Sequence, residues 1–251
     1  MKNLLALFCV DVEPDRPFFG GKRYDYFGHQ KWEGARKRIP EFLTFKQDLE
    51  KSLNCSIHFT WFFRADSQIA EMYNHNTCYS KWYKEIVDTL LQEGEEVGWH
   101  VHTWRWSKER NSWYQEINDD EWIKSCYKNG FSDFKDILGF APTSFRAGWG
   151  FHNNVSMSQL EELGIKVDLS ALPGIKNSGE KNAEGSLFNG FADWERTDIY
   201  PYQPSKEDYQ ISSENHYRLL EIPMTTFKKP LISYINQGLP ISFKEIPEIR
   251  Y

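Results

Sequence analysis

The chain alternates between short apolar runs and longer stretches in which apolar residues recur with a helical period. The apolar runs predict strands at about 4–10, 56–64, 96–102, 143–146, 165–168 and 219–225. The periodic stretches predict helices at about 32–52, 80–93, 119–138 and 154–163. Strands that alternate with helices in this way are typical of parallel β/α units.

Three further segments and one proline complete the outline. Pro40 interrupts the first helix, so a later start of that helix is an alternative. Residues 14–31 are rich in glycine and aromatic residues, and a loop of that length is more often functional than a plain connection. We read 175–217 as an insertion or lid and expect 227–251, which hold three prolines, to be a loosely ordered tail. One domain over 1–251 is expected.

Composition narrows the classes of function. The 251 residues are 40% hydrophobic and 26% charged, which suits one globular α/β domain. A net charge of −6 without a long basic run argues against nucleic acid as a partner. No segment is long enough to span a membrane, and the apolar start runs into Asp11 without a cleavage site, so we expect a cytoplasmic protein. The many aromatic rings suit a large core or a sugar-binding cleft.

Two short motifs carry the chemistry. Asp11 and Glu13 follow the first apolar run, and His100 and His102 stand at the end of the third. Residues two apart on a strand project to the same face, so each pair points one way. One carboxylate and two imidazoles can form a facial metal site, and the other carboxylate is then free to act as a base. Taken alone, each motif also fits a surface charge or two half-exposed strand histidines.

Other polar residues also stand near predicted strand ends. If the strands close into a barrel, their side chains converge at its carboxyl-terminal mouth. A Rossmann fold is disfavoured because no Gly-x-Gly-x-x-Gly follows the first strand. A two-carboxylate glycosidase is disfavoured because Asp11 and Glu13 lie on the same side of one strand, whereas a glycosidase needs its carboxylates on opposite sides of the bond that it cleaves. The residues in question are Asp11, Glu13, Arg64, His100, His102, Arg146, Asp168 and Glu221.

The order of the motifs resembles that of the polysaccharide deacetylases, which carry the NodB homology domain and form carbohydrate esterase family four. The resemblance spans most of 4–226. It rests on Asp-x-Glu, then 96–104 (EVGWHVHTW), 145–148 (FRAG), 168–170 (DLS) and 220–225 (LEIPMT), and 202–209 (YQPSKEDY) resembles a segment of the bacterial His-x-His branch. It implies an irregular (β/α)7 barrel and removal of an acetyl group from an N-acetylated sugar with the help of one divalent metal ion.

The resemblance also implies roles for single residues. Asp11 matches the catalytic base, and Glu13 stands where a metal-binding carboxylate is expected. His100 matches the first metal histidine. The second usually comes four positions later, where this chain has Trp104, so His102 is the expected substitute.

Two more motif residues carry implied roles. Arg146 matches the arginine that holds the base carboxylate, and Asp168 matches a motif that supports the far side of the site. The family's late general-acid histidine has no counterpart after His216. His152 is the leading candidate for the general acid in its place, ahead of His29. For each of them, an exposed or merely hydrogen-bonded histidine is the simpler interpretation.

Substrate contacts are expected from four residues. Arg64 could bind a substrate carboxylate or phosphate, or else pair with Asp66. Trp104, Trp149 and Glu221 complete the predicted substrate-binding set.

The leading hypothesis is therefore a metal-dependent N-deacetylase acting on a glycan or on a lipid- or nucleotide-linked sugar. Glu/His/His accommodates zinc, our first expectation, and also iron, manganese or cobalt. A deformylase or other amidohydrolase on the same barrel is the second hypothesis. A degenerate barrel that only binds carbohydrate is the third. Metal content separates the third from the others, and a panel of N-acetyl and N-formyl sugars separates the first two.

Overall fold

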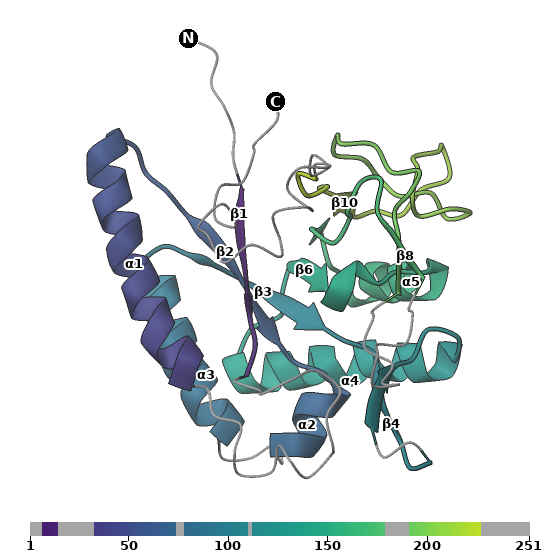
Figure 1. The fold of residues 1–251 in the computed structure, drawn as a ribbon, viewed down its shortest axis with the longest axis horizontal. Helices are drawn as coiled ribbons and strands as arrows, with labels where there is room; N and C mark the ends of the chain where they lie inside the picture. Colours follow the sequence, from purple (N-terminus) through teal and green to yellow (C-terminus); the bar gives the residue numbers. More distant parts are fainter. Residues whose placement is uncertain (1–6, 15–32, 74–77, 110–111, 179–190, 227–251) are drawn as a thin grey trace, which may run out of the picture.

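The computed structural model describes residues 7–14, 33–73, 78–109, 112–178 and 191–226. Its main elements are five α-helices and a parallel sheet (Figure 1). The helices are α1 (Glu33–Leu53), α2 (Ser67–Tyr73), α3 (Cys78–Gln92), α4 (Asp120–Leu138) and α5 (Asn154–Leu163). The strands of the sheet are β1 (Phe8–Val12), β2 (Phe59–Arg64), β3 (Glu96–Val101), β6 (Ser144–Ala147), β7 (Val167–Asp168) and β10 (Leu220–Glu221).

The sheet has the order β1-β2-β3-β6-β7-β10, and every pair in it is parallel. The predicted α/β class with a parallel sheet is confirmed. Within the described residues no ladder joins β1 to β10, so these two strands are the edges of the sheet. All six strands nevertheless run the same way, which brings their carboxyl ends to one side of the molecule.

One face of the sheet is covered by helices. Phe42 of α1 packs edge-on against Trp61 of β2, and Trp99 of β3 packs against Tyr127 and Phe131 of α4. Residues opposite each other in a parallel ladder point to the same face, and neighbours along a strand point to opposite faces. Phe145 lies opposite Trp99 and shares its side of the sheet.

The strand rows therefore divide the sheet by parity. The helix-covered face receives Val12, Phe63, Trp99, Phe145, Asp168 and Glu221. The opposite face receives the next row, Arg64, His100 and Arg146. The row to which a strand-end residue belongs therefore decides on which face of the sheet its side chain lies, and with which other side chains it can form a site.

Several boundaries differ from the sequence-based prediction. β1 begins at Phe8 and ends at Val12, so Asp11 lies inside the strand and not after it. α1 passes through Pro40 without ending. Its residues Ile39 and Leu43 are buried in the hydrophobic core, and packing of that apolar face offsets the hydrogen bond that a proline cannot make.

Two elements were not expected from the sequence. α2 is only seven residues long, too short for its apolar period to stand out. Residues 103–118, between the third predicted strand and the helix predicted at 119–138, contain an antiparallel hairpin, β4 (Trp104–Ser107) with β5 (Ser112–Gln115). Trp106 and Trp113 lie directly opposite each other across it.

The predicted insertion is only partly described. β8 (Lys176–Ser178) pairs with β9 (Phe191–Asp193), and 194–217 follow mostly irregular turns. The predicted tail at 227–251 and most of the first loop lie outside the described residues. None of the described helices is both long and apolar enough to cross a bilayer.

Candidate metal centre

Glu13, His100 and His102 meet at the carboxyl end of β1 and β3. Oε1 of Glu13 lies 3.0 Å from Nε2 of His102 and 3.4 Å from Nε2 of His100. The two Nε2 atoms are 3.1 Å apart. Both histidines are buried, and the Glu13 side chain is 23% exposed. Three potential ligand atoms therefore face one point that stays open on the carboxylate side.

These separations fit a shared metal ion. Ligands about 2.0–2.2 Å from one ion, at angles between about 90° and about 109°, lie roughly 2.8–3.6 Å from one another. All three measured distances fall within that interval. In the described part of the chain this is the one cluster of three or more His, Cys, Asp or Glu residues with such geometry.

The proton position of His100 is set by its second nitrogen. Nδ1 lies 2.8 Å from the backbone carbonyl oxygen of Arg146. A carbonyl can only accept, so Nδ1 carries the proton and Nε2 keeps the lone pair that a metal needs. Burial alone lowers the pKa of His100, but the charges of Asp11 and Glu13 outweigh it and raise the pKa above its usual value.

Glu13 is held from behind by Arg64. Nη1 of Arg64 lies 3.3 Å from Oε2 of Glu13, which leaves Oε1 for the histidines. Burial favours a raised pKa for Glu13, but the Arg64 charge and the two histidines dominate and hold the pKa well below its usual range. The carboxylate is therefore charged at neutral pH, as a ligand must be.

Asp66 anchors both Arg64 and His102. Its Oδ2 lies 2.6 Å from Nε of Arg64 and accepts the backbone N–H of His102 over 3.2 Å. Arg64 also bonds Gln68. Burial opposes the charge of Asp66, yet Arg64 lowers its pKa. The alternative expected for Arg64, a salt bridge with Asp66, is present, and its fully buried guanidinium is not exposed to a substrate.

The ring of His102 sits in an aromatic corner. Trp104 stacks on it at 5.9 Å between ring centroids, and Trp149 meets it edge-on at 6.1 Å. Its Nδ1 is buried and has no hydrogen-bond partner among the described residues. Burial and then the charge of Arg64 lower the pKa of His102 to about 3, so the ring is neutral at physiological pH.

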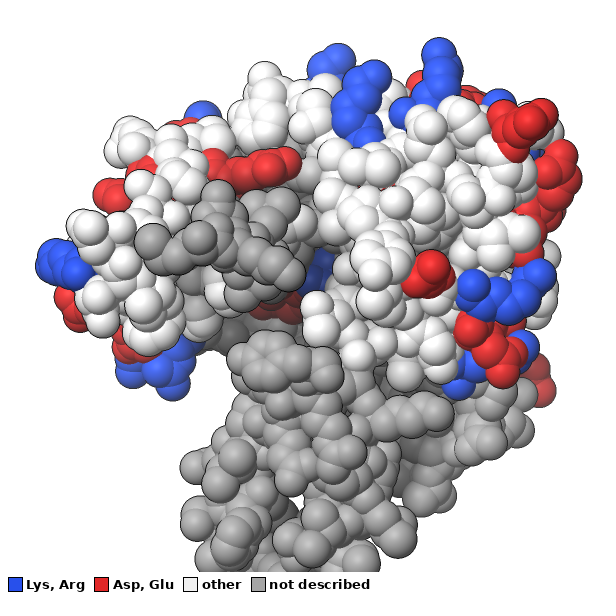
Figure 2. Space-filling view, turned by 90° about the horizontal axis from the view of Figure 1, so that it is seen from above, with Lys and Arg blue, Asp and Glu red and all other residues white. Residues whose placement is uncertain are grey.

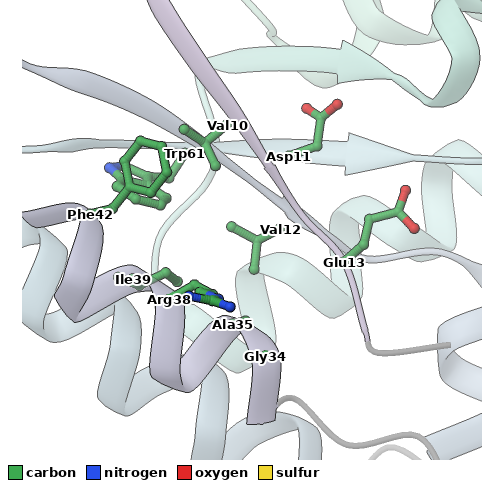
Figure 3. A pocket seen from close by; sticks show the side chains of 10 residues that line it. All are labelled: Val10, Asp11, Val12, Glu13, Gly34, Ala35, Arg38, Ile39, Phe42 and Trp61. Atoms are coloured by element: carbon green, nitrogen blue, oxygen red, sulfur yellow. The ribbon is translucent and has the colours of Figure 1, made fainter. Parts of the chain in front are cut away.

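Asp11 lies beside this cluster on the same side of β1. In the close view, Asp11 and Glu13 project to one side of the strand, while Val10 and Val12 project to the other, toward α1 (Figure 3). Oδ1 of Asp11 is 3.5 Å from Nε of Arg146, and its side chain is 33% exposed. Asp11 and Arg146 therefore meet as the resemblance implies, and the Asp11 carboxylate is accessible to solvent.

Charge is mixed on the face of the molecule that Figure 2 shows. Its described residues carry interspersed acidic and basic side chains. They form no continuous basic surface of the kind that binds a nucleic acid.

Three predicted site residues do not join the others. Asp168 and Glu221 fall on the row that faces the helices, and both are fully buried. Nε2 of His152 lies 2.9 Å from Oδ2 of Asp168, also out of contact with solvent. The expectation that all strand-end side chains converge is wrong for Asp168 and Glu221, because their parity directs them to the opposite face.

This second cluster has its own hydrogen bonds. Asp168 bonds the hydroxyl of Ser170, which accepts the N–H of Ala147, and Glu221 accepts the N–H of Ala171. Burial and the neighbouring Asp168 raise the pKa of Glu221 well above its usual value. These bonds join the end of β6 and the segment after β7 to β7 and β10, and Glu221 is not exposed to a substrate.

The two tryptophans predicted to contact a substrate differ in their exposure. Trp104 is fully buried beneath the centre, so it supports His102 and is not exposed to a substrate. Trp149 is half-buried and packs on Trp104 at 5.2 Å. The rival histidine His29 lies outside the described residues. Sequence reasoning missed Gly148, which contacts the His102 ring, although it stands in the quoted motif at 145–148.

No protein-family model and no curated protein sequence matches the chain. Solved structures to which the chain is similar include proteins described as polysaccharide or peptidoglycan deacetylases and proteins described as members of carbohydrate esterase family four. One is a protein described as a polysaccharide deacetylase from Mycobacterium smegmatis, at 13% identity and a TM-score of 0.42 over 87% of this chain and 58% of the other.

Two further structures are similar over a smaller share of the chain. The peptidoglycan deacetylase PdaC from Bacillus subtilis shows 20% identity and a TM-score of 0.32, over 63% of this chain and 55% of its own. A family-four pseudoenzyme from Bacillus anthracis shows 12% identity and a TM-score of 0.36, over 64% and 41%. This chain thus spans about half the length of these proteins.

Proposed function

We propose that the protein is a metal-dependent hydrolase that removes the acetyl group from an N-acetylated sugar. The observation that carries the proposal is the meeting of Oε1 of Glu13 and the Nε2 atoms of His100 and His102 within 3.0–3.4 Å. Asp11, a carboxylate outside that set, lies on the same side of β1. A metal ligand set with a separate base is one arrangement that supports amide hydrolysis at neutral pH.

Glu13, His100 and His102 would hold the ion, with zinc as the first expectation. A divalent ion in this position would polarise the acetyl carbonyl and activate a water molecule. Arg64 and the carbonyl of Arg146 keep the ligand atoms directed at one point from behind. Such contacts behind the ligands commonly govern metal affinity.

Asp11 supplies the proton chemistry. Its exposed carboxylate accepts a proton from the attacking water, while Arg146 holds it in place at 3.5 Å. The carbon–nitrogen bond then breaks, and the nitrogen must gain a proton to leave as an amine. Asp11 can return the proton that it took. His152 cannot supply this proton, because it is buried on the other face of the sheet. One residue thus serves first as base and then as acid.

The sugar and the cytoplasmic location stay predictions. We expect a glycan or a lipid- or nucleotide-linked sugar, with half-buried Trp149 beside the centre as an aromatic contact for its ring.

The test combines metal analysis with a substrate panel. Protein purified without a histidine tag should contain about one divalent ion per chain and release acetate from N-acetylated sugars. Release of formate alone from the N-formyl sugars would favour a deformylase. A protein that binds glycans but holds no metal and hydrolyses no amide would be a binding-only barrel.

A further inference from the structure

The ring nitrogens of the two histidines of the candidate centre lie closer together than their backbone positions would along a regular strand. Residues i and i+2 on a strand lie roughly 6.6–6.8 Å apart along it. The Nε2 atoms of His100 and His102 are 3.1 Å apart, and their ring centroids are 4.8 Å apart. His102 follows the last residue of β3, so its backbone is free of the ladder and its ring can lean toward His100.

Gly148 lies where the leaning ring needs space. A Cβ built on Gly148 would come within 2.2 Å of Nδ1, 2.3 Å of Cγ and 2.4 Å of Cε1 of His102. Real contacts of a Cβ are never that short, so any other residue would push the ring away. The backbone does not demand glycine here, because Gly148 is absent from the described glycines with positive φ.

The ring has no simple way to yield. Trp104 stacks on one of its faces, and Trp149, itself in the left-handed region at φ 59°, meets it edge-on. Asp66 fixes the backbone N–H of His102. A ring displaced from Gly148 would therefore carry its Nε2 away from Glu13 and His100.

We propose that Gly148 is a positioning residue, which brings His102 into the ligand set by leaving room for its ring. Its importance for metal binding rests on the proposed function, whereas its effect on the ring is a property of the fold. The chain thus couples two distant motifs: a histidine two positions after the first one, and a glycine two positions after Arg146.

Metal binding gives the first test. Gly148→Ala should weaken the affinity for Zn²⁺, measured by titration of the metal-free protein, by about 10–100-fold, as loss of a ligand's support typically does. Gly139→Ala is the matched control. Gly139 caps α4 with φ 82° and a Cβ there meets nothing within 4 Å, so that variant should lose stability but keep its zinc affinity. Unchanged affinity in Gly148→Ala would overturn the proposal.

A double-mutant cycle gives the second test, without any metal. Gly148→Ala should lower the Tm of the metal-free protein while His102 is present, and should have little effect in His102→Ala, where the ring is gone. A single variant that does not fold beside a double variant that does would support the same conclusion. An equal loss in both backgrounds, or a double variant that does not fold, would show that Gly148 serves another purpose. If no variant binds zinc, the proposed function fails while this cycle still decides the role of Gly148.

Discussion

Nη1 of Arg64 lies 3.3 Å from Oε2 of Glu13, so a buried guanidinium holds the carboxylate whose other oxygen faces the two histidines. The same guanidinium meets Asp66 at 2.6 Å, and Asp66 binds the N–H of His102. One buried ion pair therefore orients two of the three candidate ligands. An interaction of this kind acts on the metal centre without touching a substrate.

Arg64→Lys tests that arrangement. Lysine keeps the charge but has a single ammonium group, so it cannot bond Glu13, Asp66 and Gln68 as the planar guanidinium does. We expect zinc affinity to fall by about 10-fold or more and the Tm to fall as well. Arg105→Lys, on a partly exposed side chain paired with Glu116 and Asp119, should change the zinc affinity little and lower the Tm less than Arg64→Lys does. Wild-type affinity in Arg64→Lys would mean that Glu13 needs no such support.

The ligand set itself is tested by removing each side chain. Glu13→Gln, His100→Ala and His102→Ala should each reduce bound metal from about one ion per chain to little or none. The fold should persist in circular dichroism, because no described helix or strand depends on the cluster for its hydrogen bonds. His58→Ala changes an exposed histidine away from the centre and should keep the metal. Full occupancy in His102→Ala would remove that residue from the set.

Asp11→Asn separates the base from the ligands. The amide keeps the shape of the side chain but cannot accept a proton from water, so we expect a loss of about 10²–10⁴ in kcat. Metal content, measured on the same sample, should stay at the wild-type level. Loss of the metal together with activity would instead make Asp11 a ligand.

The sequence predicted the alternation of strands and helices well, because long amphipathic periods and capping residues mark elements such as α4 and α5 clearly. Asp119 caps α4, and Asn153 with Ser156 forms a capping box at α5. It also predicted that Glu13, His100 and His102 meet, since the two-residue period puts paired side chains on one face.

The sequence could not predict to which face of the sheet each strand-end residue points. A shift of one position decides whether a strand-end residue faces the centre or the helices, and the short β7 and β10 show no periodicity that would fix it. Asp168 and Glu221 were therefore assigned to the wrong face. The role of Gly148 depends on a close contact between segments far apart in the sequence, which no local pattern reveals.

His152→Ala should affect stability more than catalysis. The imidazole is fully buried between Asp168, Ser156 and the rings of Phe145 and Trp194. Its removal leaves a cavity and takes away the group nearest to Oδ2 of Asp168, so the Tm should fall by several degrees. Turnover measured well below that Tm should stay within a few-fold of wild type. A fall in kcat of about 10² or more, with the metal retained, would make His152 the acid and rule out the single-residue mechanism.

Acid should destabilise the metal-free protein through His102. Burial and the charge of Arg64 lower its pKa to about 3, against an ordinary value of 6.5. Below pH 6.5 the unfolded chain binds a proton there that the folded chain does not, so stability is lost as the pH falls. His100 has a raised pKa, and its contribution is already complete in this range. Glu13 and Asp66 have lowered pKa values and lose their contributions only below the ordinary values of 4.5 and 3.8. Glu221 acts in the opposite direction, because its raised pKa lets the folded chain bind a proton before the unfolded chain does, so its contribution to stability grows as the pH falls toward 4.5. We therefore compare variants: between pH 6.5 and 4.5 the Tm of His102→Asn should fall less, or rise more, than that of wild type, whereas His58→Asn should follow wild type. An unchanged slope in His102→Asn would show that this imidazole is not the group that resists protonation.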